Sequence, residues 1–226
     1  MSSPPSPRPR QLALALDHAE SHAREDFLSG PGNAAALALI ESWPDWPANA
    51  VALVGPQGSG KSHLAAIWAA ASGARMISGR ALNETGLLPA LATGALVVEE
   101  AAAADERTLF HLINLSREEE AFLLFTARTA PSTWPVVIAD LASRLRALPL
   151  ITLQAPDDGL LRGLIVKLAA DRQLDLKEDV VAYLATHIER SFAAARAAII
   201  ALDNEALRQG RRPTRALAAK LFRDGV

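Results

Sequence analysis

Five short apolar runs mark the first two thirds of the chain. They are AVALV (50–54), ARMIS (74–78), ALVVE (95–99), AFLLFT (121–126) and LITL (150–153). Unbroken apolar runs of this length are typical of strands buried on both faces. Helical stretches or long connections separate them, which is the pattern of a parallel sheet covered by helices. The pattern therefore predicts an α/β fold with a five-stranded parallel sheet.

After Pro156 the pattern changes to helical spacing. An acidic start at 157–158 opens one amphipathic stretch, two more follow, and TRALAAKLF closes the chain with Thr214 as a helix cap. No strand pattern occurs here. The sequence predicts an α/β core over 17–156 and a small all-helical lid over 157–226. A further helix is predicted from Asn33 to about Trp43, because the prolines of WPDWPAN end it.

The N-terminal stretch has two parts. Residues 1–10 contain four of the fourteen prolines and are typical of a disordered tail. The hexapeptide QLALAL (11–16) alternates with period two, which suits an edge strand and equally an extended peptide that adds to a partner's surface. These residues leave both interpretations open. In the second, the contacts would come from Gln11, Leu12, Leu14 and Leu16.

Composition excludes several classes of protein. The chain has 226 residues, half of them apolar, which suits one large domain or two small ones. A net charge of −2 and a pI of about 6.2 argue against a bare duplex-DNA binder. The absence of cysteine excludes disulfides and thiolate metal sites, and fits a cytoplasmic protein. No apolar run reaches the length of a membrane span, and no secretory signal opens the chain.

The strongest chemical signal is GPQGSGKS, which matches G-x-x-x-x-G-K-[ST] between a predicted strand and a predicted helix. Glycines let backbone N–H groups reach phosphate oxygens, Lys61 can bridge the β- and γ-phosphates, and Ser62 can bind Mg²⁺. A glycine-rich turn with an incidental lysine is the alternative, and the strand–loop–helix context disfavours it. We expect ATP or ADP with Mg²⁺ as cofactors. The candidate nucleotide-binding residues are Gly55, Pro56, Gln57, Gly58, Ser59, Gly60, Lys61, Ser62 and His63.

Two carboxylates end the third predicted strand. A P-loop enzyme needs an acidic residue there to hold Mg²⁺, and Glu99 stands at that position. Glu100 follows where a carboxylate would orient the attacking water. The alternative is a solvated acidic pair that opens the next helix, since acidic residues suit a helix start.

Three further segments, in order, accompany the P-loop: DFLSGPGNAAAL (26–37), DLASRL (140–145) and ERSFAAARAAIIALD (189–203). This set resembles the AAA+ domain of the DnaA family, and within it the short Hda-type homologues. The resemblance covers about Gln11 to Phe222. It implies an AAA+ P-loop core followed by a helical lid, and it implies that the DNA-reading domain of an initiator is missing after Val226.

The resemblance also implies roles for single residues. Phe27, Gly30 and Asn33 would lie near the adenine. Thr126 falls in the sensor 1 region, where the family usually has a small polar residue followed by aspartate and arginine. Here Ala127 precedes Arg128, so this chain departs from that pattern.

The resemblance implies roles for two arginines, Arg144 and Arg196. Arg144 resembles an arginine finger, which points at the γ-phosphate bound by a neighbouring subunit. From the residues alone it is a surface arginine paired with Asp140, four residues earlier. Arg196 resembles the sensor 2 arginine, which reaches from the lid to the nucleotide. Its alternative is an arginine at the edge of an apolar helix face with its head in water.

An Hda-type resemblance implies a negative regulator of chromosomal replication initiation. Such a protein docks on the DNA polymerase III sliding clamp (beta subunit) through residues 11–16 and stimulates hydrolysis of the ATP held by DnaA. It would meet DNA only through the clamp, and its own ATPase would be weak. An AAA+ ATPase acting in its own right, as a helicase-loader-like motor or a homo-oligomer such as a homodimer, is the alternative. A small-molecule P-loop kinase is a third, which Arg196 disfavours.

Overall fold

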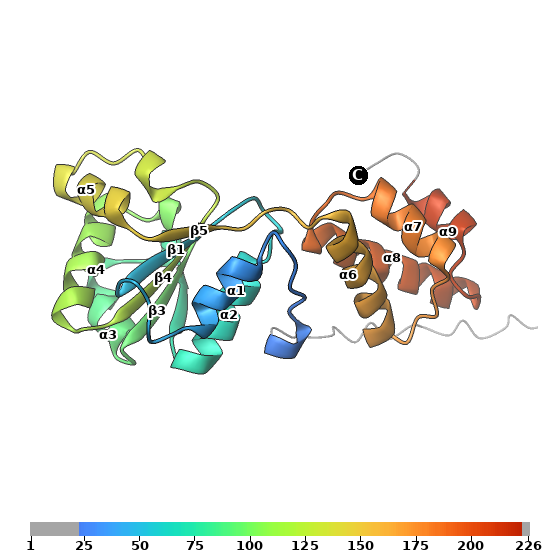
Figure 1. Cartoon of the computed structure of the whole chain (residues 1–226), viewed down its shortest axis with the longest axis horizontal. Helices are drawn as coiled ribbons and strands as arrows, with labels where there is room; N and C mark the ends of the chain where they lie inside the picture. The colour runs from blue at the N-terminus through green and yellow to red at the C-terminus, as the bar shows by residue number, and fades with distance from the viewer. Residues whose placement is uncertain (1–22, 223–226) are drawn as a thin grey trace, which may run out of the picture.

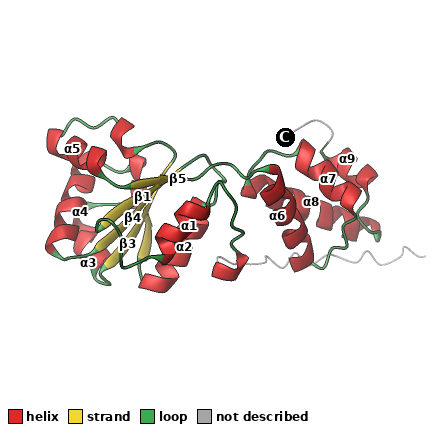
Figure 2. Ribbon diagram, in the orientation of Figure 1, coloured by secondary structure: helices red, strands yellow, loops and turns green. Residues whose placement is uncertain are grey.

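The computed structural model describes residues 23–222, so the predicted tail (1–10) and the QLALAL hexapeptide (11–16) lie outside the described residues. Helices and strands alternate through the core, and helices alone follow it (Figure 2). The core elements are α1 (Ala34–Glu41), β1 (Ala50–Val54), α2 (Lys61–Ser72), β2 (Arg75–Ser78), α3 (Leu87–Leu91), β3 (Ala95–Glu99), α4 (Glu106–Glu118), β4 (Phe122–Ala127), α5 (Ala139–Ala147) and β5 (Leu150–Thr152). The remaining helices are α6 (Asp158–Asp171), α7 (Glu178–His187), α8 (Phe192–Gln209) and α9 (Arg215–Leu221).

The five strands form one parallel sheet in the order β2-β3-β4-β1-β5. This confirms the predicted fold class. In the register, Val54 of β1 pairs with Ala127 of β4, and Val98 of β3 pairs with Phe125. The carboxyl ends of β3, β4 and β1 are therefore neighbours, which is where open parallel sheets bind ligands.

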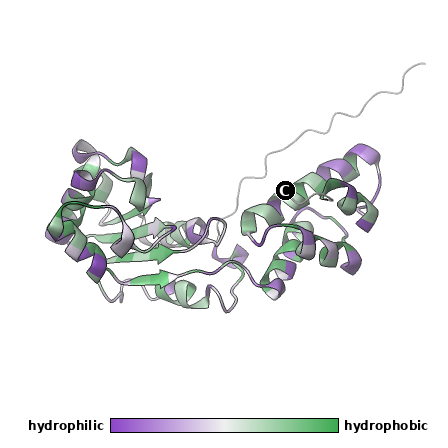
Figure 3. Ribbon diagram, turned by 90° about the horizontal axis from the view of Figure 1, so that it is seen from above, coloured by the Kyte–Doolittle hydropathy of each residue, from purple (hydrophilic) through white to green (hydrophobic). Residues whose placement is uncertain are grey.

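Helices cover both faces of this sheet, with α1 and α2 on one face and α3, α4 and α5 on the other (Figure 1). Under α1 and α2, the rings of Trp46 and Trp68 stack 4.8 Å apart between centroids. The strands are the apolar centre of this sandwich (Figure 3). Leu53, Leu124 and Phe125 have no exposed surface, as expected for strands buried on both faces.

The four C-terminal helices pack around an apolar core of their own, separate from the two layers of the sheet. Its fully buried members include Leu161, Ile165, Val180, Leu184, Ile199 and Leu202. Side-chain caps fix where the helices begin: Asp157 caps α6 and Ser191 caps α8. The predicted cap at Thr214 is confirmed, since its Oγ1 accepts from the N–H of Leu217 at 3.2 Å. Within residues 23–222, no helix combines the length and apolarity that crossing a bilayer requires.

Candidate functional site

The P-loop follows β1 directly and ends where α2 begins at Lys61. Gly58 and Gly60 have φ values of 73° and 97°, a region that L side chains rarely adopt. A Cβ added to Gly58 would also lie 2.6 Å from the Cβ of Ser191 in the lid. The first N–H groups of α2 have no helical carbonyl before them to bind. The loop and helix start therefore form a cradle of N–H groups suited to phosphate.

Lys61 lies over the loop that precedes it. Its Nζ donates to the carbonyl oxygens of Gly55 and Pro56, at 2.7 Å each. Burial lowers the pKa of Lys61, the nearby charge of Arg128 lowers it further, and Glu100 opposes both. A bound triphosphate would offer this ammonium charged acceptors in place of neutral carbonyls, which is the stronger interaction.

The segment before α1 is held against the P-loop. Phe27 is buried, and its ring comes within 3.5 Å of a Cβ placed on Gly60. The same ring meets His63 edge-to-face, with centroids 5.3 Å apart. Asn33 stabilises the turn that follows Phe27, since its side-chain oxygen accepts a hydrogen bond from the N–H of Gly30 at 2.7 Å. The structure thus places Phe27 beside the phosphate cradle and against His63, whereas Gly30 and Asn33 form the turn that follows Phe27 in the chain.

Glu99 and Glu100 lie at the carboxyl end of β3. Glu100 has φ 49° and ψ 46°, a left-handed conformation that is uncommon for a residue other than glycine and that clusters at functional sites. Its N–H donates to the Oγ1 of Thr126, at 3.2 Å, and Thr126 is buried at the end of β4. The hydroxyl of Thr126 therefore holds the backbone of Glu100 in place.

The oxygen donors beside the cradle fit Mg²⁺ in chemical type. Ser62 offers an exposed hydroxyl in the first turn of α2, and Glu99 a half-buried carboxylate at the end of β3. Mg²⁺ favours oxygen ligands and is commonly held by few protein groups together with substrate phosphates. Residues 23–222 contain no group of three or more His, Asp or Glu side chains that could hold a metal alone. A magnesium ion here would depend on the nucleotide for its remaining ligands.

Arg128, which the resemblance places in the sensor 1 region with Thr126, belongs to the same cluster. It follows the last residue of β4, and its Nη2 donates to the Oε1 of Gln57 in the P-loop, at 3.0 Å. The same Nη2 lies 3.9 Å from a carboxylate oxygen of Glu100. The sequence placed this cation after a predicted strand, but did not predict its contacts with Gln57 and Glu100.

The lid meets the cradle at the start of α8. The N–H of Phe192 donates to the carbonyl of Gly58 at 3.0 Å, so a backbone bond joins lid and P-loop. A cavity of about 530 Å³ lies between Gln57 and the lid residues around Ser191 and Ala194. Arg196 follows Phe192 by one helical turn and so shares its side of α8. The structure places Arg196 on the lid helix that contacts the cradle.

An ion pair ties the lid to the segment before α1. Lys167 of α6 donates to Asp26 at 2.5 Å and lies 3.2 Å from Asp171. The hydrogen bond with Asp26 raises the pKa of Lys167, more than burial lowers it. The pair joins residues 141 positions apart, so no local pattern in the sequence announces it.

Comparison with known proteins gives the same architecture. No protein-family model and no curated protein matches the sequence. Among solved structures, domain III of the replication initiation protein DnaA from Thermotoga maritima aligns with 91% of this chain and 97% of that chain, at a TM-score of 0.74 and 19% identity. The chain has the AAA+ fold. DnaA bound to AMPPCP and single-stranded DNA aligns over 82% of this chain and 67% of that one, at a TM-score of 0.65 and 19% identity.

A branch-migration motor also has the AAA+ fold and aligns with this chain at a similar TM-score. The Thermotoga maritima RuvB Holliday junction motor aligns with 90% of this chain and 72% of that chain, at a TM-score of 0.71 and 18% identity. The likeness therefore establishes the AAA+ architecture and does not by itself distinguish an initiator from a motor.

Arg144 lies away from the cradle of its own AAA+ core. It belongs to α5, at the end of the core remote from the lid (Figure 1). Its guanidinium donates twice to Asp140, at 2.9 and 3.1 Å, and lies 5.5 Å from the ring centre of Phe110. The ion pair expected from the residues alone is thus present. One nitrogen, Nη1, is buried and has no hydrogen-bond partner among the described residues.

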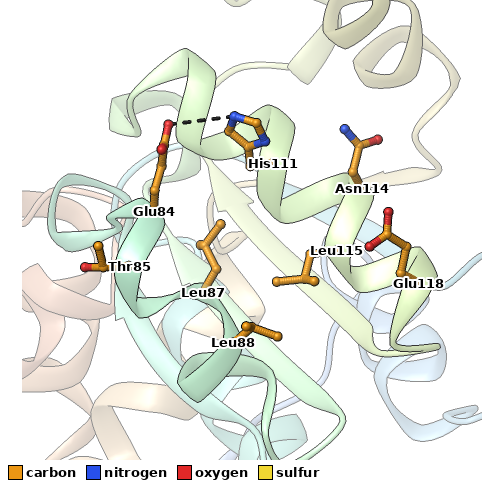
Figure 4. A pocket seen from close by; sticks show the side chains of 8 residues that line it. All are labelled: Glu84, Thr85, Leu87, Leu88, His111, Asn114, Leu115 and Glu118. Atoms are coloured by element: carbon orange, nitrogen blue, oxygen red, sulfur yellow. Dashed lines mark ion pairs between the residues drawn. The ribbon is translucent and has the colours of Figure 1, made fainter.

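A second cavity, of about 550 Å³, opens between the segment 84–88 and α4 (Figure 4). Leu87, Leu88 and Leu115 form its apolar part, and Glu84 lies 3.8 Å from His111 at its rim. None of the predicted site residues lines it. The cradle at the carboxyl edge of the sheet therefore remains the candidate active site.

Proposed function

We propose that this chain is a nucleotide-binding AAA+ regulator of replication initiation, which promotes hydrolysis of the ATP bound to DnaA. The observation that carries the proposal is the separation of two features within one chain. The P-loop lies under the lid at one end of the core, whereas Arg144 lies on α5 at the other end. Such a molecule can bind nucleotide in its own cradle and present Arg144 to the nucleotide that a second protein molecule holds.

The nucleotide would be ATP or ADP with Mg²⁺. Backbone N–H groups of the P-loop and Lys61 would hold the phosphates, and Ser62 and Glu99 would contribute oxygens to the metal. Mg²⁺, when bound, neutralises phosphate charge; the chain's own residues orient the nucleotide. The backbone bond from Phe192 to Gly58 ties the lid to the cradle, so the position of the lid would follow what the cradle holds.

The position of the Arg144 side chain supports a contact with a partner protein. Its pairing with Asp140 is partly exposed, and its buried Nη1 finds no hydrogen-bond partner within residues 23–222, so this position is not optimal for the guanidinium. A γ-phosphate of a neighbouring molecule would supply better acceptors. Val137, two residues before the start of α5, is 89% exposed and offers an apolar contact next to that helix. This end of the core suits docking against another AAA+ protein.

Recruitment would come from the N-terminal hexapeptide. Gln11 would fill a polar subsite of the sliding clamp, and Leu14 and Leu16 its apolar subsites, with Leu12 between them. The chain would then reach DNA through the clamp. This part of the proposal rests on the sequence pattern and the resemblance, since residues 11–16 lie outside the described residues.

The test mixes the purified chain with DNA-loaded clamp and DnaA carrying labelled ATP, and follows conversion to ADP. Wild type should accelerate conversion, and Arg144→Ala should lose the acceleration, because an arginine finger contributes about 10³–10⁵-fold in rate. Arg146→Ala is the matched control, since Arg146 is an exposed arginine on the same helix. Acceleration by Arg144→Ala equal to that of wild type refutes the proposal.

The likeness to RuvB favours a second candidate, an ATPase that assembles with copies of itself. In that case Arg144 would act on the nucleotide of an identical neighbour. Sizing of the pure chain with ATP separates the two: rings or filaments, with hydrolysis that depends on Arg144 and needs no DnaA, would favour the motor.

A further inference from the structure

A group of positive charges lies at the C-terminal end of the lid. Residues 206–222 carry five of the 23 lysines and arginines of the chain and none of its 25 acidic residues. The remainder of the chain is therefore acidic, a contrast that the net charge of −2 conceals. Charge asymmetry of this kind is typical of a protein that meets nucleic acid or a membrane. The basic surface consists of Arg208, Arg211, Arg212, Arg215 and Lys220.

The turn between α8 and α9 exposes these side chains. Gly210 ends α8 in a left-handed conformation with φ 61°, Pro213 is buried, and Thr214 caps α9. Three other residues thus shape the turn, and the arginines beside them are exposed. α8 begins at the cradle, and at a rise of 1.5 Å per residue its far end lies about 25 Å away. The basic surface is therefore separate from the nucleotide site (Figure 1).

Three members of the basic surface lie near carboxylates. Arg212 is 3.1 Å from Asp175, in a pair whose side chains are 84% and 74% exposed, so water and salt weaken it. Arg208 donates to Glu205 at 2.8 Å. This hydrogen bond lowers the pKa of Glu205, and the nearby charge of Lys220 lowers it further. One carboxylate thus faces two cations, and the surface stays positive.

The other two members, Arg211 and Arg215, form no ion pair among residues 23–222. The guanidinium carbon of Arg215 lies 5.9 Å from the ring centre of Tyr183, and this ring stacks on His187 with centroids 3.9 Å apart. The aromatic stack holds the guanidinium at the surface without neutralising its charge. A planar guanidinium offers paired donors that match the oxygens of a phosphate.

We propose that the basic surface binds the phosphate backbone of DNA without reading its sequence. Successive phosphates supply a row of anions, which four arginines within residues 208–215 can match. A bilayer suits this surface less, because the apolar residues of α9, Leu217 and Ala218, are buried in the lid core and cannot insert into lipid. Docking on the clamp, as proposed above, would raise the effective concentration of DNA at the lid.

The test is fluorescence polarisation of labelled duplexes of several unrelated sequences, titrated with the pure chain in the absence of clamp and nucleotide. Salt is varied from about 50 to 200 mM, because each phosphate contact adds about −0.9 to the slope of log affinity against log salt concentration. Wild type should bind all the duplexes with similar affinity. The double variant Arg211→Gln, Arg215→Gln should bind at least about tenfold more weakly, with a slope smaller in magnitude by about 1.8.

The matched control is the double variant Arg162→Gln, Arg190→Gln. It removes two charges from the same lid, at exposed arginines paired with Glu178 and Asp158, and should bind DNA within about twofold of wild type. Circular dichroism of both variants checks that they fold like wild type.

Four results would overturn the inference. These are no binding of duplex by wild type at about 50 mM salt, equal losses in the two double variants, a strong preference for one duplex sequence, and unchanged binding by the Arg211→Gln, Arg215→Gln variant. Phosphatidylserine vesicles are the second probe. Binding of vesicles but not of duplex, lost in the same variant, would show that the surface meets a membrane instead. The assay with DnaA and clamp is separate, so the proposed function can stand if this inference fails.

Discussion

Removing the link between Lys167 and Asp26 should loosen the lid. The two side chains are 22% and 28% exposed, intermediate between surface pairs, which contribute about 0.2–1 kcal/mol, and buried pairs, whose breaking costs about 3–5 kcal/mol. Lys167 also reaches Asp171, and its replacement ends both contacts. We therefore expect Lys167→Ala to lower the free energy of unfolding by about 1–2 kcal/mol, or about 2–8 °C in the midpoint temperature.

The assay is urea unfolding at neutral pH, followed by circular dichroism. Arg162→Ala is the control, since it breaks an exposed pair on the same helix and should cost less than about 1 kcal/mol. The raised pKa of Lys167 determines how the stabilisation by this ion pair depends on pH. The stabilisation is complete below the ordinary value of 10.5 and is lost as pH rises through the higher pKa of the folded state. Equal midpoints for Lys167→Ala and Arg162→Ala would refute the reasoning.

Two further predictions concern the nucleotide site, and a third concerns the N-terminal hexapeptide. Nucleotide affinity should fall with rising pH before pH reaches 10.5, because the lowered pKa of Lys61 removes its charge earlier than that of an ordinary lysine; titrations across alkaline pH check this. Thr126→Val should cost about 1 kcal/mol in urea unfolding, because it leaves the N–H of Glu100 without its acceptor. An isolated peptide of residues 8–20 should bind the sliding clamp in a polarisation assay, and Gln11→Ala should weaken it about tenfold through loss of a polar contact.

The local patterns of apolar residues in the sequence were sufficient to predict the five strands and the fold class. The apolar runs at 50–54 and 95–99 coincide with β1 and β3, because strands buried on both faces need no polar alternation. The other boundaries differ by about a residue; β4, for instance, covers Phe122–Ala127. The short helix α3 was not predicted, since its five residues include a proline and are too few to show helical spacing.

The candidate site was predictable where it is contiguous. GPQGSGKS carries its function within eight residues, and Glu99 and Glu100 follow a recognisable strand. The resemblance placed Arg128 in the sensor 1 region, but its contact with Gln57 was not predictable, because Gln57 is 71 residues away and only strand order brings β4 beside β1. Pairings set by packing, like that of Lys167 with Asp26, leave no periodic signal in the chain.

Gly55–Ser62 is the proposed nucleotide site of the molecule. Equilibrium binding of fluorescent ADP and ATP to the pure chain with Mg²⁺, in the absence of DnaA and clamp, tests it most directly. We expect saturable binding by wild type and a loss of affinity of at least about tenfold in Lys61→Ala, which removes a charged phosphate contact. Arg162→Ala should bind like wild type. No binding by wild type, or equal binding by Lys61→Ala, would show that the P-loop does not bind nucleotide through Lys61.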